Sequence, residues 1–181
     1  MRPILWRRLD CPGHDWCRLS KVRTGWELEG TAVFIERRVK YRLDYRMLGD
    51  QAFHTISGEV RGFRGTSRVE HRVARTSSGF RLDGRLQRGL DACAHLDLGF
   101  TPSTNLFQIR SLNLARGEAA DVPVAWLDLA KGRLNRLEQR YERRSATAYW
   151  YDAPRFRYHA LLEVLPNGFV ARYPKLWELE P

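Results

Sequence analysis

Apolar and polar residues alternate along most of this chain. The clearest alternating runs are Tyr41–Met47, Leu90–Leu98 and Phe156–Val164. A period of two residues places successive side chains on opposite faces of a β-strand. Turn-forming residues separate such runs at the spacing of roughly 8–12 residues that is typical of all-β folds. The pattern therefore predicts a mainly β protein of about a dozen short strands.

Very little helix is expected, at most one or two turns near Asn105–Arg110. The segment 133–144, RLNRLEQRYERR, fits both the helical and the strand period. On a helix, Arg136 and Arg140 would be like charges four residues apart, which is unfavourable. We therefore expect a strand there. The dipeptide Asn167-Gly168 predicts a hairpin turn between the last strands.

The strand expected over Leu90–Leu98 has one apolar face and one face of chemically active residues. That second face carries Asp91, Cys93, His95 and Asp97. The chain then enters the polar corner Thr101–Asn105, where Pro102 favours extended backbone before it and short polar side chains can bond local backbone. Five side chains can converge at this corner as a polar binding lip beside an apolar surface: Asp97, Thr101, Thr104, Asn105 and Arg110.

Arg110 is the strongest of these candidates for recognising a ligand headgroup, because a guanidinium fork suits oxyanions. Alternation with Ile109 and Leu112 is expected to point it away from the apolar layer. If it is buried, its charge must be offset, either by Asp97 or by an anion of the ligand. A structural pair with Asp97 and a binding role both stay open.

Four motifs in the same order make this sequence similar to the bacterial "putative glycolipid-binding" family. The run TPSTNLFQIRSL, residues 101–112, resembles that family's TP-x-TN-x-x-x-IR-x-L signature. The ending GFVARYPKLWEL, residues 168–179, is also similar. Further likeness lies at Trp6, Leu9-Asp10, Pro12-Gly13, Gln139-Arg140-Tyr141 and Tyr149–Tyr151. The resemblance spans nearly the whole chain.

The resemblance implies a single curved antiparallel sheet that closes into a β-roll or half-barrel, like the lipoprotein-carrying factors LolA and LolB. It also implies glycolipid binding. We expect non-catalytic binding of a glycolipid or another amphipathic small molecule in an apolar cavity with a polar lip, without a cofactor. The resemblance also adds Gln139, Tyr141 and Tyr173 to the candidate ligand-binding residues.

Length and composition favour one domain over residues 1–181. No apolar run approaches the ~20 residues of a membrane span, and the start, MRPILWRRLD, lacks the apolar core of a secretion signal. Three cysteines fit a reducing compartment. We therefore expect a cytoplasmic protein.

The net charge of +10 invites anionic partners, namely nucleic acid, phosphorylated ligands or an acidic membrane surface. An arginine-coated surface without a specific partner is the simpler interpretation, since only four of the 31 basic residues are lysines. No RNP motif, KH loop, zinc finger or helix-turn-helix pattern is present, so nucleic acid is an unlikely partner. The oligomeric state is left open.

The sequence also contains residues that could form a metal site or a catalytic pair. Cys11, His14 and Cys17, with Cys93 and His95, offer metal ligands, but their spacing is not that of paired zinc ligands. We expect free thiols and no metal. A carboxylate–histidine pair at His95 would suit a hydrolase acting on a lipid-linked sugar, although a histidine held by a neighbouring aspartate is the simpler account.

Overall fold

The computed structural model describes residues 2–181, and its strands form a single sheet of 15 strands in the order β8-β7-β6-β5-β4-β3-β2-β1-β15-β14-β13-β12-β11-β10-β9. Neighbouring strands are antiparallel, except that β9 and β10 are parallel. The strands are β1 (Ile4–Arg8), β2 (Gly13–Val22), β3 (Gly25–Glu36), β4 (Val39–Gly49), β5 (Thr55–Arg64), β6 (Ser67–Thr76), β7 (Gly79–Leu82), β8 (Arg85–Leu86), β9 (His95–Asp97), β10 (Ala119–Asp128), β11 (Arg133–Arg143), β12 (Ala148–Ala153), β13 (Tyr158–Val164), β14 (Val170–Tyr173) and β15 (Trp177–Leu179). The helices are α1 (Asn105–Leu112) and the 3-10 turn η1 (Pro154–Phe156).

The mainly β prediction with very little helix is confirmed. In β4, Leu43, Tyr45 and Met47 are buried while Arg42 and Arg46 are exposed, as the alternation predicts. The ambiguous segment forms strand β11, which pairs with β10 and β12. The strand form turns the like charges of β11 outward to water and its apolar residues inward. None of the described helices is long and apolar enough to cross a membrane.

The strand predicted over Leu90–Leu98 is wrong in extent. Only His95–Asp97 forms strand β9, and the preceding residues turn instead, with Cys93 N–H donating to Leu90 O at 3.0 Å. All three β9 residues are buried, so β9 has no polar outer face. The physical reason is that β9 is covered on both faces. In such a strand, the alternation of apolar and polar residues no longer indicates which face is exposed to solvent.

The sheet does not close into a barrel, because β8 and β9 remain its two edges. β9 comes closest to closing it, beside Thr55 of β5. Thr55 N–H donates to Ala94 O at 3.0 Å, and the Thr55 hydroxyl accepts from Leu96 N–H at 2.9 Å. Contacts at one residue do not make a strand ladder, and the predicted closure is therefore not seen among residues 2–181.

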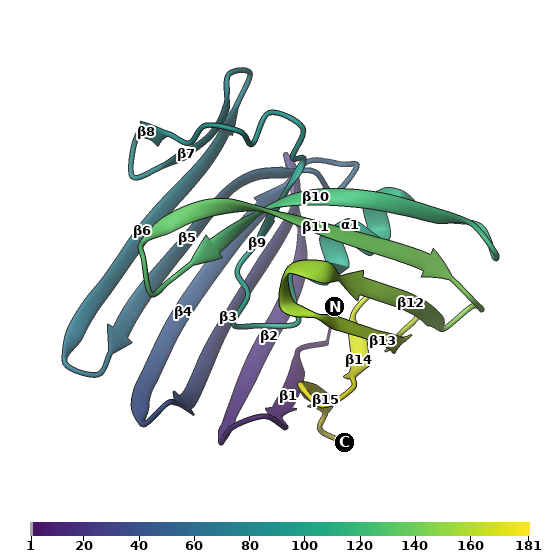
Figure 1. Ribbon diagram of the computed structural model, residues 1–181, viewed down its shortest axis with the longest axis horizontal. Coiled ribbons are helices and arrows are strands. Elements are labelled where there is room, and N and C mark those ends of the chain that lie inside the picture. The colour runs from purple at the N-terminus through teal and green to yellow at the C-terminus, as the bar shows by residue number, and fades with distance from the viewer. Residues whose placement is uncertain (1) are drawn as a thin grey trace.

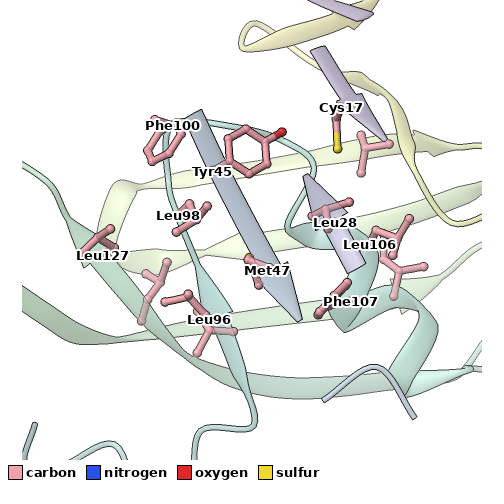
Figure 2. Packing of buried hydrophobic residues seen from close by; sticks show 14 of the residues in the cluster. Cys17, Leu28, Tyr45, Met47, Leu96, Leu98, Phe100, Leu106, Phe107 and Leu127 are labelled. Atoms are coloured by element: carbon pink, nitrogen blue, oxygen red, sulfur yellow. The ribbon is translucent and has the colours of Figure 1, made fainter. Parts of the chain in front are cut away.

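Strand β9 and helix α1 pack against the surrounding strands, and the core lies between them. Figure 1 shows β10 and β11 crossing in front of β3–β6, with α1 beside β10. Leu96 and Leu98 join a buried cluster with Met47 of β4 and Leu127 of β10. Phe107 of α1 is fully buried in the same cluster, as Figure 2 shows. This packing fixes the segment that carries the candidate polar residues.

The first and last strands of the chain are neighbours and join the two halves of the sheet. β1 pairs antiparallel with β15, with Trp6 opposite Leu179. The fully buried Trp6 indole N–H donates to Val170 O of β14 at 2.7 Å, and its ring meets Phe169 edge-on at 5.6 Å. Trp6 therefore ties the N-terminal strand to the C-terminal strands.

Replacing Trp6 by Phe should lower the free energy of unfolding by ~1–3 kcal/mol, because the buried Val170 carbonyl loses its donor. Trp16→Phe is the control, since Trp16 is 39% exposed on β2. Urea unfolding followed by circular dichroism measures both variants. Equal effects of the two substitutions would contradict the role of the buried hydrogen bond.

Candidate ligand-binding cleft

A cleft of about 720 Å³ opens between the β3–β4 hairpin and strands β10–β14. Its volume falls within the ~300–1,000 Å³ typical of small-molecule sites. Leu98, Leu127 and Leu137 supply apolar lining, and nine aromatic residues supply more of it. The aromatic lining residues are Phe34, Tyr41, Phe100, Trp126, Tyr151, Phe156, Tyr158, Tyr173 and Trp177.

One wall of the cleft is a cluster of tyrosines from β12, β13 and β14. The Tyr173 ring lies 5.5 Å from Tyr151 and 5.3 Å from Tyr158. The Tyr158 hydroxyl donates to Pro174 O at 2.6 Å, which fixes its ring. Burial raises the pKa of Tyr158 to about 12, so its hydroxyl stays neutral near pH 7. The wall therefore offers flat apolar rings to a ligand.

Trp126 and Phe156 form an exposed aromatic lip. Their rings meet edge-on at 5.2 Å, and Arg155 lies over the Trp126 ring at 5.4 Å. Phe156 is 49% exposed. Gly99, with φ +72°, lies directly against the indole, and a Cβ there would overlap it. This glycine is therefore required both by its backbone conformation and by the position of Trp126.

The opposite side of the cleft holds Arg8, whose guanidinium lies 4.6 Å from the Phe34 ring and 5.2 Å from the Trp177 ring. Its Nε and Nη2 each donate to Asp10 at 2.9 Å. Its side chain is only 9% exposed, and its buried Nη1 has no hydrogen-bond partner among the described residues. An unpaired buried donor costs ~1–3 kcal/mol, so an oxygen atom of a ligand would be stabilising there.

Four of the eight ligand-binding residues predicted from the sequence line the cleft, three of them on its polar floor and Tyr173 in the tyrosine wall. Asp97, Thr101, Asn105 and Tyr173 line the cleft itself. Gln139 and Tyr141 lie just beneath. The Gln139 amide donates to Asp97 at 2.6 Å, and the Asn105 amide donates to the Tyr141 hydroxyl at 2.6 Å. Thr104 is fully buried at the start of α1.

Asp97 is a buried carboxyl group without a basic partner among residues 2–181. Burial raises its pKa, while hydrogen bonds from Gly99 N–H, at 2.7 Å, and from Gln139 oppose that rise. A carboxylate has about four lone-pair sites, so Asp97 keeps capacity to accept from a ligand hydroxyl. The floor can thus orient a polar headgroup.

Arg110 does not lie with the other candidates. It is on the exposed side of α1, with its guanidinium 5.1 Å from the Phe53 ring, and it does not line the cleft. Five residues of helix rotate the chain by ~500°, so Arg110 and Asn105 face directions ~140° apart. The predicted convergence is therefore wrong for Arg110. No ion pair joins it to Asp97 in the part of the chain described.

The carboxylate–histidine pair considered for catalysis is not formed. The His95 ring lies 5.7 Å from the His54 ring, and its buried Nδ1 has no partner among the described residues. Burial, with a smaller contribution from His54, lowers the pKa of His95 to about 4. Asp91 lies in the turn before β9 rather than on a shared strand face. The hydrolase hypothesis loses the pair on which it was based.

Sequence reasoning missed Asp15, a fully buried carboxyl group beneath the floor. The Tyr45 hydroxyl donates to its two oxygens at 3.0 and 3.1 Å, and the Thr101 hydroxyl also donates to it. Burial raises the pKa of Asp15 to about 7. The sequence does contain an indication of this residue, because Asp15 alternates in phase with Cys17 and Leu19 and shares the inward face of β2 with them. Arg8 similarly shares the inward face of β1 with Trp6.

The three cysteines are not joined by a disulfide. Cys17 and Cys93 are buried, and Cys11 is partly buried. Burial raises the pKa of Cys93 to about 11. Within residues 2–181, no three ligating side chains gather as a metal site.

Comparison with known proteins assigns the chain to a family. A family model described as "Putative glycolipid-binding" matches residues 3–178. The chain belongs to this family. A crystal structure of a DUF1089 family protein from Pseudomonas aeruginosa is 25% identical, covers 91% of both chains and superposes with a TM-score of 0.79. No curated protein matches the sequence. The family resemblance seen in the motifs is thus confirmed.

The raised pKa of Asp15 makes a pH prediction. Between the ordinary pKa of 3.8 and about 7, the folded state binds the proton more tightly than the unfolded state. The contribution of Asp15 to the free energy of unfolding is therefore complete below about pH 4. It is lost as the pH rises towards and through 7, by up to ~1.4 kcal/mol for each pH unit. Asp15→Asn removes this loss.

The measurement is chemical unfolding of both proteins at several pH values between 4 and 8. The stability of the variant relative to wild type should rise steadily from pH 4 to 7, and the comparison cancels other titrating groups such as His95. Asp121→Asn, at a side chain 74% exposed, is the control. A difference that stays flat over this range would contradict the prediction.

Proposed function

We propose that this protein binds an amphipathic ligand, a glycolipid or a related acyl compound, in the cleft and without catalysis. The observation that carries the proposal is the combination of an aromatic, leucine-lined cleft with a polar floor and a buried, unpaired donor on Arg8. The family description supports the same class of ligand.

The two parts of such a ligand match two parts of the cleft. Burying an acyl chain against the leucines and tyrosines gains ~0.8 kcal/mol per methylene group. The lip rings of Trp126 and Phe156 offer flat faces to a sugar ring. Arg8 Nη1 would donate to an oxygen of the ligand, and Asp97 would accept from a sugar hydroxyl. The floor and the lip then hold the headgroup while the walls hold the chain.

Octyl glucoside below its micelle concentration is a suitable probe, because it has one sugar and one acyl-like chain. We expect it to change the tryptophan fluorescence of the protein saturably, through Trp126 and Trp177. Glucose alone should produce no saturable change at the same concentrations, since the apolar contacts supply most of the affinity. Equal binding of the two compounds, or binding of neither, would contradict the proposal.

The position of Arg8 gives a matched pair of variants. Arg8→Gln should weaken octyl glucoside binding ~10–100-fold, the loss expected for a charge-assisted hydrogen bond. Arg7→Gln removes the same charge from the opposite face of β1, where the side chain is 54% exposed and paired with Glu178, and should bind normally. Fluorescence titration measures both.

Arg8→Gln also leaves Asp10 without its partner, so its melting temperature must be compared with that of wild type. If the variant does not fold, Phe156→Ala is the substitute, because Phe156 is half exposed and its loss leaves the core intact. Normal binding by a folded Arg8→Gln variant or by Phe156→Ala would argue against the cleft as the binding site.

A further inference from the structure

A second pocket, of about 430 Å³, lies at the other end of α1 from the cleft. It is bounded by the C-terminal half of α1, the loop at Gln51–Phe53, the start of β12 and the turn after β13. It shares no lining residue with the cleft. Of the described residues that line it, two are arginines, Arg110 and Arg143, and none is acidic. The pocket therefore concentrates positive charge.

Arg110 carries a charge that no acidic side chain among the described residues offsets. It has no ion pair with any residue among 2–181, and its guanidinium lies over the Phe53 ring at 5.1 Å. Gly168, with φ +97°, lies against the stem of Arg110, where a Cβ would overlap the side chain. The absence of a side chain at Gly168 thus leaves space for the Arg110 side chain beside the pocket.

Arg143 is held by backbone carbonyls instead of a carboxylate. Its Nη1 donates to Leu114 O at 2.7 Å and its Nε donates to Ser145 O at 3.2 Å. Carbonyl oxygens orient a guanidinium group without neutralising it. No ion pair of Arg143 exists in the part of the chain described, so its positive charge is also available to a ligand.

Tyr149 brings a third donor to the same place. Tyr149 lines the pocket, and its side chain is mostly buried. No hydrogen bond of its hydroxyl is present among the described residues, and that oxygen is not one of the fully buried unpaired atoms. The Arg143 guanidinium lies 5.8 Å from its ring. Burial raises the pKa of Tyr149, and the charges of Arg143 and Arg110 both oppose that rise. All three residues line the same pocket.

We propose that this pocket binds a phosphate group through Arg110, Arg143 and the Tyr149 hydroxyl. Two uncompensated guanidinium groups and a neutral donor, with no competing carboxylate, are the chemistry that recognises a tetrahedral oxyanion. The phosphate can belong to a small phosphorylated compound or to the headgroup of an acidic lipid. This site is separate from the cleft and does not depend on the function proposed for it.

The first arm of the test is calorimetric titration with inorganic phosphate in a phosphate-free buffer at low salt. Wild type should bind saturably, Arg110→Gln at least ~10-fold more weakly, and Tyr149→Phe several-fold more weakly. Arg172→Gln is the matched control, because it removes the same charge from a side chain that is 56% exposed and paired with Glu163. It should bind as wild type does.

The second arm distinguishes the two sources of phosphate. Vesicles of phosphatidylcholine, with or without phosphatidylglycerol, are sedimented with each protein. Sedimentation of wild type and Arg172→Gln, but not Arg110→Gln, with the phosphatidylglycerol vesicles identifies a lipid headgroup; phosphate binding without sedimentation identifies a small soluble compound.

Three results would overturn the proposal: no binding in either arm, equal weakening by Arg110→Gln and Arg172→Gln, or binding unchanged in both Arg110→Gln and Tyr149→Phe. Equal weakening would mean that only the net charge matters. Arg110→Gln breaks no hydrogen bond or ion pair of the described chain, so its fold is expected to persist, and its melting temperature checks this. Octyl glucoside binding to the same variant reports separately on the cleft.

Discussion

Polar side chains buried in the middle of an apolar core are the constraint on which this structure depends. Most of the segment from β9 to the start of α1 is buried, with Gly99 exposed and one side facing the cleft, so its polar groups depend largely on partners inside the protein. Those partners come from distant strands, namely Asp15 of β2, Tyr45 of β4 and Gln139 and Tyr141 of β11. The network therefore joins both halves of the sheet and makes the floor of the cleft rigid.

The same constraint separates the structural residues from the residues available to a ligand. Some polar side chains bond only to other side chains of the network, namely Gln139, Tyr141 and Asp15. Asp97 keeps part of its capacity and faces the cleft, and Arg8 keeps one donor free. A polar network that is nearly but not fully satisfied is a natural place for a ligand, because the ligand supplies the missing partners.

Alternation and turn residues were enough to predict the long hairpins, since each has one wet and one dry face. They were not enough for β9, where both faces are dry and the period of two carries no information. Arg8 and Asp15 are each a single charged residue on the inward face of a strand, and period-two alternation alone does not distinguish such a residue from one that faces water. The predicted direction of Arg110 is wrong because it follows strand alternation, whereas Arg110 lies in the helix expected near Asn105–Arg110.

The pairing of β1 with β15 has a consequence for the order in which the protein assembles. Most strands pair with the next strand in the chain, and such hairpins can form locally as soon as both strands exist. The junction between β1 and β15 joins residues about 170 positions apart, so it closes only after nearly the whole chain has been synthesised. The cleft is lined both by Arg8 of β1 and by Tyr173 of β14, so completing it requires this long-range pairing.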